Sequence, residues 1–171
     1  MSQAEIKEAT SAEDYAAGIT LIEEYAMALG VDLCFQNFSA EIANLPMIYG
    51  PPRGFLLLAR TNRESVGCVA VRSRDTVICE MKRLYVKPQY RGVGLGRRLV
   101  ESGVRSAQKL GYSRMVLDTL PGMAEAQALY ESLGFREIEG YYPNPLEGVR
   151  YFACELVHSE QNQCASPTSS L

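Results

Sequence analysis

The feature that most constrains the fold is the stretch from residue 76 to residue 117, where strand-like and helix-like patterns alternate across a glycine-rich segment. Residues 76–87 are rich in β-forming side chains. Apolar or small residues then recur at helical spacing until Gly111, and a short buried strand follows at residues 115–117. A strand, a glycine loop, a helix and a second strand form a βαβ unit, so these two strands should be parallel.

The segments on either side of this unit predict antiparallel strands. Polar turns separate three β-rich runs ahead of the glycine loop, which indicates two hairpins. The sheet should therefore be mixed, and a later helix and two more strands complete it. The predicted strands are residues 55–59, 66–71, 76–87, 115–117, 135–138 and 151–156, and the later helix is 123–133.

The N-terminal part predicts helices. Ser11, with Asp14 three residues later, has the pattern of an imperfect capping box, and apolar spacing continues from there to Gly30. Residues 39–45 favour a short helix that is stopped by Pro46 and the prolines and glycine that follow.

Length and composition indicate a single globular domain. The 171 residues are 47% apolar and 22% charged with a net charge of −3, which is typical of a soluble domain and lacks the basic stripe of nucleic-acid binders. No apolar run approaches the roughly 20 residues that span a bilayer, so we expect no membrane partner and a cytoplasmic location. Residues 1–158 should form the domain, and residues 159–171 a flexible tail.

The cysteines and the single histidine predict no metal site. The five cysteines are odd in number, scattered and without a Cys-x-x-Cys pair, so reduced thiols are expected. Cys68, Cys79 and Cys154 lie among apolar residues, where packing is the simpler role and reactivity the alternative. His158 lies near the C-terminus, outside any pattern that indicates catalysis.

The glycine loop has the chemistry of an anion site. Gly92, Gly94 and Gly96 leave successive backbone amides accessible, and the following helix adds free N–H groups and the positive end of its dipole. Arg91, Arg97 and Arg98 add positive charge. Taken alone, the run is also compatible with tight turns or a dinucleotide fold, although the preceding hairpins disfavour the latter and no Gly-Lys-Ser/Thr follows.

Two motifs occur in order along the chain: Leu84-Tyr85-Val86-x-Pro88-x-Tyr90-Arg91-Gly92-x-Gly94-x-Gly96 and Ala128-Leu129-Tyr130-Glu131-x-x-Gly134-Phe135. Together they resemble the GNAT N-acetyltransferase superfamily, and the resemblance covers residues 55–157. The resemblance implies an α/β fold of the α+β type: a mixed, mostly antiparallel sheet of about six to seven strands, splayed between the fourth and fifth and flanked by about four helices. It also implies acetyl-CoA as co-substrate and no metal.

The resemblance also assigns the residues that would hold coenzyme A. The strand before the loop would contact the pantetheine arm through its backbone, and the loop amides would contact the pyrophosphate. The strand residues are Leu84, Tyr85 and Val86, and the loop residues are Arg91, Gly92, Val93, Gly94, Leu95, Gly96 and Arg97.

Acetyl transfer to an amine requires an acid for the leaving thiolate and a base for the amine. The resemblance implies Tyr130 as the general acid; the alternative is that its ring only fills the apolar face of a short helix. It implies Glu80 as the general base, which strand alternation would place on the side of Leu84 and Val86. Glu80 could instead form a simple ion pair with Lys82 or Arg83.

The acceptor is not specified by these motifs. Family members recognise acceptors through segments equivalent to residues 25–50 and 139–150, and many carry Asn where this chain has Met123. Arg72, Arg83 or Arg150 could receive a carboxylate, which favours a small amine or an amino-acid-like acceptor. A protein lysine or N-terminal acetyltransferase, a noncatalytic acyl-CoA sensor and a homodimer remain open.

Overall fold

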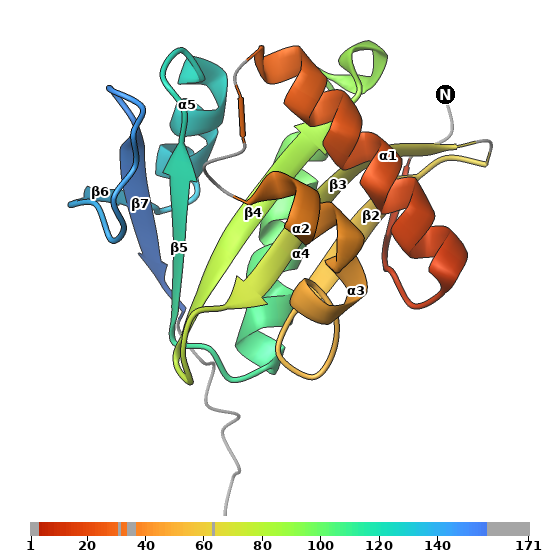
Figure 1. Ribbon diagram of the computed structural model, residues 1–171, viewed down its shortest axis with the longest axis horizontal. Helices are drawn as coiled ribbons and strands as arrows, with labels where there is room; N and C mark the ends of the chain where they lie inside the picture. The colour runs from red at the N-terminus through yellow and green to blue at the C-terminus, as the bar shows by residue number, and fades with distance from the viewer. Residues whose placement is uncertain (1–3, 31, 34–36, 63, 157–171) are drawn as a thin grey trace, which may run out of the picture.

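The computed structural model describes residues 4–30, 32–33, 37–62 and 64–156, and its centre is a seven-stranded sheet (Figure 1). The strand order is β1-β2-β3-β4-β5-β7-β6. Within the described residues β4 and β5 run parallel, and all other neighbouring strands are antiparallel. The strands are β1 (Glu5–Glu8), β2 (Phe55–Arg60), β3 (Ser65–Ser73), β4 (Ile78–Val86), β5 (Arg114–Thr119), β6 (Arg136–Ile138) and β7 (Arg150–Glu155).

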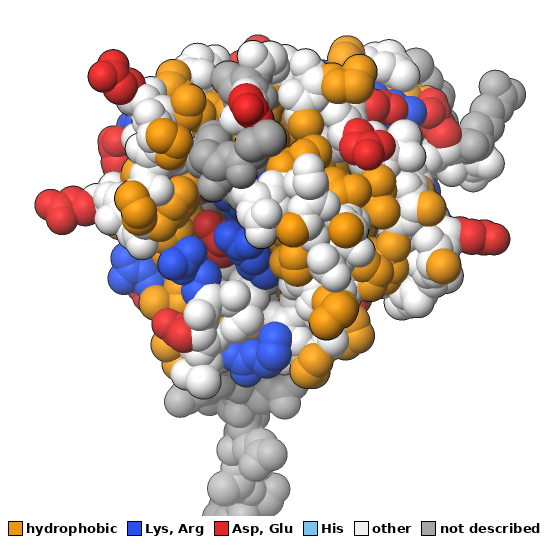
Figure 2. All heavy atoms as spheres, in the orientation of Figure 1, with side chains coloured by type: hydrophobic (Ala, Val, Ile, Leu, Met, Phe, Trp, Pro, Cys, Tyr) orange, Lys and Arg blue, Asp and Glu red, His pale blue; other side chains and the backbone are white. Residues whose placement is uncertain are grey.

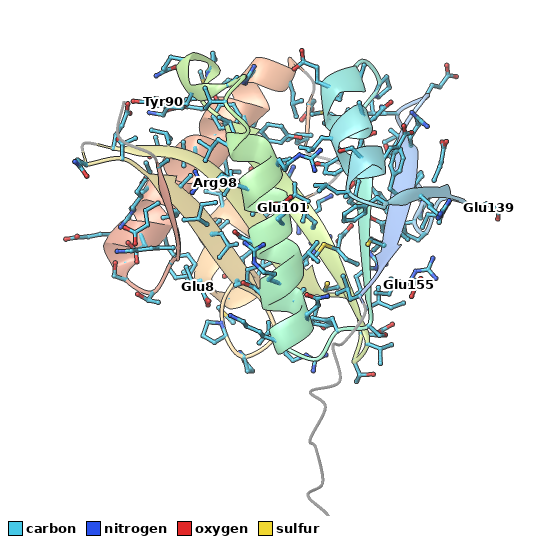
Figure 3. The ribbon with its side chains drawn as sticks, turned by 180° about the vertical axis from the view of Figure 1, so that it is seen from behind. Glu8, Tyr90, Arg98, Glu101, Glu139 and Glu155 are labelled. Atoms are coloured by element: carbon cyan, nitrogen blue, oxygen red, sulfur yellow. The ribbon has the colours of Figure 1, made fainter. Side chains whose placement is uncertain are left out.

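Helices cover both faces of the sheet. Figure 1 shows α1, α2 and α3 on the near face, and Figure 3 shows α4 and α5 on the opposite face. The predicted mixed, mostly antiparallel α+β architecture is confirmed. The helices are α1 (Ala12–Leu29), α2 (Phe38–Ala43), α3 (Leu45–Ile48), the short 3-10 helix η2 (Pro88–Tyr90), α4 (Leu95–Lys109) and α5 (Ala124–Ser132).

The sheet opens between β4 and β5, as the resemblance implied. These strands pair only from Ile78 opposite Arg114 to Glu80 opposite Val116, although β4 continues to Val86. Beyond that point they diverge and leave a V-shaped opening at their carboxyl ends (Figure 1).

A β-bulge in the middle of β4 decides which side chains face which layer. Two steps along β3, from Cys68 to Ala70, correspond to three steps along β4, from Tyr85 back to Lys82. Arg83 lies in this bulge with a left-handed φ of 60°, a conformation that costs roughly 1–2 kcal/mol for a non-glycine residue. One extra residue swaps the two faces of the strand beyond it.

This bulge corrects the prediction for Glu80. Strand alternation predicted Glu80 on the side of Leu84 and Val86, but those two side chains pack with the α4 layer. Glu80 instead lies opposite Arg72, on the face covered by α1 and α2.

Two apolar clusters hold the helices to the sheet. On one face α4 packs against β3 and β4, with Leu99 and Val100 fully buried. On the other face α1 and α3 pack against β2, with Ile22 and Leu45 fully buried. Each of these side chains contributes about 1.5–3 kcal/mol, so each helix layer is anchored separately on its own face of the sheet.

Local signals predicted several helix ends. The Ser11 hydroxyl accepts from the Asp14 amide at 3.1 Å and the Asp14 carboxylate accepts from the Ser11 amide at 3.1 Å, which completes the capping box at the start of α1. Gly30 ends α1 with φ 64°. Pro46 was wrongly predicted to stop a helix, because it lies in the first turn of α3, where a missing N–H costs nothing.

Some sequence predictions fall outside the described residues, namely the proposed tail at 159–171, His158, Cys34 and Cys164. Cys68 and Cys79 are buried, Cys154 is partly buried, and all three are free thiols. Among the described residues no helix is both long and apolar enough to cross a membrane.

Candidate active site

The opening between β4 and β5 leads into a large outer cavity of about 660 Å³. The carboxyl half of β4, the glycine loop and the start of α5 enclose it. Every residue predicted to hold coenzyme A lines this cavity except Val93, whose side chain is 73% exposed. The predicted residues that line it are Leu84, Tyr85, Val86, Arg91, Gly92, Gly94, Leu95, Gly96 and Arg97.

The glycine loop has the geometry of an anion site. Gly92 and Gly94 both have φ 79°, which favours glycine, and Gly94 is the N-cap of α4. The first N–H groups of α4 therefore point out of the helix at the edge of the outer cavity. A Cβ at Gly94 would meet no protein atom within 4 Å, so the space above this residue is open to a ligand.

The three arginines near the loop have different roles. The Arg91 Nε donates to the Val86 carbonyl at 2.8 Å, and Arg97 donates to the Ser132 hydroxyl at 2.6 Å, which joins α4 to α5. Both line the outer cavity. Arg98 donates to the Ala4 carbonyl at 2.8 Å, on the side of α4 away from α5 (Figure 3). Arg98 therefore stabilises the fold through this hydrogen bond, and the prediction that it adds positive charge beside the glycine loop was wrong.

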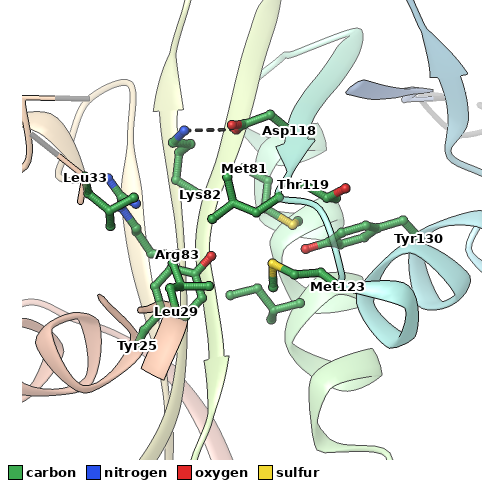
Figure 4. Close-up of a pocket in the computed structure, with 12 residues that line it drawn as sticks. Tyr25, Leu29, Leu33, Met81, Lys82, Arg83, Asp118, Thr119, Met123 and Tyr130 are labelled. Atoms are coloured by element: carbon green, nitrogen blue, oxygen red, sulfur yellow. Dashed lines mark hydrogen bonds and ion pairs between the residues drawn. The ribbon is translucent and has the colours of Figure 1, made fainter. Parts of the chain in front are cut away.

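A smaller inner cavity of about 30 Å³ adjoins the outer one at the point where β4 and β5 separate (Figure 4). The two cavities share Tyr25, Leu29, Leu84 and Met123 in their linings. The other residues around the inner cavity are Leu33, Met81, Lys82, Arg83, Asp118, Thr119, Leu120 and Tyr130.

Tyr130 packs in the apolar core and also lines the inner cavity. Its ring packs on α5 against Phe135 and Phe152, with centroid distances of 5.7 and 6.4 Å. Its hydroxyl end points into the inner cavity (Figure 4) and has no hydrogen-bond partner among the described residues. Burial raises the pKa of Tyr130 above its usual value, so the hydroxyl keeps its proton at neutral pH.

Glu80, the predicted base, does not line either cavity. Its side chain has no exposed surface, and its carboxylate accepts from the Arg72 Nε at 2.7 Å and from the Tyr141 hydroxyl at 2.8 Å. Arg74 and Lys82 approach it at 3.7 and 4.0 Å. The structure therefore does not bring Glu80 and Tyr130 together in one cavity.

Asp118 is the carboxylate that does share the inner cavity with Tyr130. It accepts from the Lys82 ammonium at 3.0 Å and from the Tyr142 hydroxyl at 2.7 Å. Burial alone would raise its pKa, but the Lys82 charge and the Tyr142 hydrogen bond outweigh burial and lower it. The sequence analysis gave this residue no part in the transfer; its position at the carboxyl end of a parallel strand was the missed signal.

The segment between β6 and β7 covers both carboxylates. Tyr141 donates to Glu80 and Tyr142 donates to Asp118, and the rings of Tyr141, Tyr142 and Tyr151 pack together with centroid distances of 5.3 to 5.6 Å. The predicted acceptor segment at 139–150 therefore reaches the opening through two phenol–carboxylate hydrogen bonds.

Solved structures of acetyltransferases share this fold. An acetyltransferase of Streptococcus agalactiae superposes with a TM-score of 0.75 at 25% identity, covering 91% of this chain and all of that one. A GNAT family acetyltransferase of Elizabethkingia anophelis, with acetyl-CoA bound, has the same fold, with a TM-score of 0.61 at 20% identity over 91% of this chain and all of that one.

The sequence comparisons name the family. Residues 20–135 match the model of the acetyltransferase (GNAT) family. An uncharacterized N-acetyltransferase of Schizosaccharomyces pombe is 47% identical over 138 residues, which cover 80% of this chain and 85% of that protein. The chain therefore belongs to the GNAT family of acetyltransferases.

Proposed function

We propose that this enzyme transfers an acetyl group from acetyl-CoA directly to a primary amine while both are bound. The unpartnered hydroxyl of Tyr130 carries the proposal, because a buried polar group without a partner is costly unless it serves a ligand. The glycine loop at the far end of the adjoining cavity suits the pyrophosphate of coenzyme A. Acetyl-CoA bound to the Elizabethkingia anophelis neighbour supports the same donor.

Tyr130 would act as the general acid. As the amine nitrogen bonds to the acetyl carbon, the bond from that carbon to sulfur breaks, and the Tyr130 hydroxyl gives its proton to the leaving thiolate. The proton lost by the nitrogen restores the phenol by way of the base or solvent. The raised pKa of Tyr130 keeps the proton in place until the thiolate forms.

Asp118 is better placed than Glu80 to face the amine. Asp118 lines the inner cavity, whereas Glu80 reaches that cavity only through Lys82, at 4.0 Å. A lowered pKa makes Asp118 a weak base for a free ammonium, but the nitrogen becomes far more acidic once it bonds to carbon. We therefore assign Asp118 to orient the amine and take this proton, and Glu80 to position its neighbours.

Tyr130→Phe tests the central assignment. We expect a fall in kcat of about 10²–10⁴-fold, the usual contribution of a positioned acid, with unchanged affinity for acetyl-CoA. The assay is thiol release over a panel of primary amines, with Tyr112→Phe as control, because Tyr112 is also buried but donates to the Arg53 carbonyl outside the cleft. Equal turnover in wild type and Tyr130→Phe would remove Tyr130 from the mechanism.

Two carboxamide variants separate the candidate bases. Asp118→Asn should lower kcat/KM for every amine, because Asp118 faces the reacting nitrogen. Glu80→Gln should lower kcat/KM only for acceptors that contact Arg72 or Arg74, the arginines that Glu80 binds. The opposite ranking would return the base to Glu80.

A further inference from the structure

We propose that Arg72 and Arg74 form a subsite for a carboxylate of the acceptor, so that the substrates are small amines that also carry a carboxylate. This inference rests on the proposed function and specifies its acceptor. Arg72 lies on β3 opposite Glu80, and Arg74 directly follows the end of β3. Both guanidinium groups approach the carboxylate of Glu80, the residue at which β4 stops pairing with β5.

The charges at this place leave a positive excess. Three cations, Arg72, Arg74 and Lys82, surround two carboxylates, Glu80 and Asp118. Figure 2 shows Lys and Arg side chains gathered around a hollow at this level of the molecule, with acidic atoms between them. One further negative charge would therefore balance the cluster.

The other two arginines that the sequence suggested for a carboxylate are already paired. Arg83 donates twice to Glu41, at 2.9 and 2.7 Å, and is almost fully buried. Arg150 is bound by Glu137 at 2.7 Å and donates to Gln127 at 2.7 Å. Neither guanidinium keeps a free edge for a substrate.

Arg72 and Arg74 are also held in place, but unlike those two they keep a free edge. The Arg72 Nε binds Glu80 at 2.7 Å, while its terminal nitrogens have no partner among the described residues, and its side chain is 34% exposed. The Arg74 guanidinium lies 4.7 Å over the Tyr141 ring, with a side chain that is 33% exposed. A guanidinium held in this way binds a carboxylate with little loss of side-chain entropy.

Glu80 organises this subsite. Its buried carboxylate holds Arg72 at 2.7 Å and Arg74 at 3.7 Å, and the Tyr141 hydroxyl holds the carboxylate in turn. Lys82 continues the series of contacts, at 4.0 Å from Glu80 and 3.0 Å from Asp118, which lines the cavity with Tyr130. The Lys82 side chain thus lies between the subsite and the inner cavity, so the chain length of the acceptor would have to match this span.

The test compares acceptors that differ only in the carboxylate. Amino acids of increasing chain length are assayed against their amides and against alkylamines of the same length, by thiol release from acetyl-CoA. For the best-fitting length we expect the acid to exceed its amide in kcat/KM by about 10- to 100-fold, as the loss of a charge-assisted hydrogen bond predicts. Arg72→Gln and Arg74→Gln should bring this ratio close to one, mainly by lowering the value for the acid.

Matched variants guard against a purely structural effect. Arg72→Lys keeps the charge but loses the fork of donors, so it should retain part of the preference. Arg114→Gln is the control, because Arg114 has a similar exposure and pairs only at the surface with Glu155 at 3.4 Å; it should leave the ratio unchanged. Thermal melting of each variant shows whether it folds.

The outcomes separate this inference from the proposed function. If acids and amides react equally well, or if the acid preference survives both Gln variants, the subsite is wrong while the acetyltransferase function stands. If acetyl-CoA binds but no amine releases thiol, the proposed function fails. Calorimetric titration with the same amino acids then decides: carboxylate-dependent binding that Arg72→Gln abolishes supports the subsite, and its absence overturns it.

Discussion

Gly94 offers a direct test of the anion site, because the free protein and the bound complex should respond differently to a side chain there. Gly94 has φ 79°, and a Cβ on it would meet no protein atom within 4 Å. Gly94→Ala should therefore cost only the backbone strain of a left-handed alanine, about 1–2 kcal/mol. For a chain of this size that corresponds to a fall in Tm of about 2–8 °C.

Gly111 is a matched control at the other end of α4. It has φ 89°, and a Cβ there would also meet nothing within 4 Å, but it lies outside both cavities. Gly111→Ala should lower Tm by the same few degrees. The two alanine variants therefore carry equal strain and differ only in whether the new Cβ stands over the proposed phosphate position.

Binding of acetyl-CoA, measured by calorimetry, should distinguish the pair. Gly94→Ala should raise Kd at least about tenfold, because losing one amide contact to a charged phosphate costs about 1.5–3 kcal/mol. Gly94→Glu should raise it more than about 100-fold, since a carboxylate would meet like charge at close range. Gly111→Ala and Gly111→Glu should bind as the wild type does. If Gly94→Glu binds acetyl-CoA as tightly as Gly111→Glu, the loop is not the anion site.

Three further predictions concern buried charges and protons. Glu41→Gln should lower the free energy of unfolding in urea by about 3–5 kcal/mol, because it leaves the Arg83 guanidinium buried without its charged partner. Glu155→Gln is the control at an exposed ion pair and should change this free energy by less than about 0.5 kcal/mol. Folding lowers the pKa of Asp118, so the ionised carboxylate stabilises the folded protein at every pH above its unfolded pKa, near 3.8. This stabilisation is lost as pH falls through the folded pKa. The difference in free energy of unfolding between wild type and Asp118→Asn should therefore shrink only below about pH 4. Because the pKa of Tyr130 is raised, kcat should show no loss attributable to this group from neutral pH to about pH 10; an alkaline limb that Tyr130→Phe removes would contradict this.

Local sequence signals were sufficient for the two ends of α1 and for the glycine loop that precedes α4. The capping box at Ser11, the left-handed Gly30 and the glycines before α4 act within a few residues, so the sequence pattern predicts them directly. β1 was missed for the corresponding reason. The strand has one apolar residue, Ile6, and its three glutamate and lysine residues are exposed. It forms only because β2 offers a free edge for pairing.

The positions of the two carboxylates could not be predicted in this way. Alternation along β4 is interrupted at Arg83, a residue type that gives no local sign of a bulge. What holds Arg83 there is its ion pair with Glu41, which lies 42 residues away in sequence on α2. Strand alternation therefore placed Glu80 on the wrong face, and Asp118 lines the inner cavity because β5 separates from β4 just before it.

The charged residues of β4 explain how the cleft keeps its width. Glu80, Lys82 and Arg83 are all buried, and each is paired with a charge from another element: Arg72 on β3, Asp118 on β5 and Glu41 on α2. The backbone pairing of β4 with β5 ends at Glu80, and the Lys82–Asp118 pair spans the strands just beyond it (Figure 4). Past that point a flexible lysine side chain, rather than a ladder of backbone hydrogen bonds, sets the distance between the strands. If the proposed function holds, a bound acceptor that neutralises part of this cluster would therefore act on a contact that joins β4 to β5.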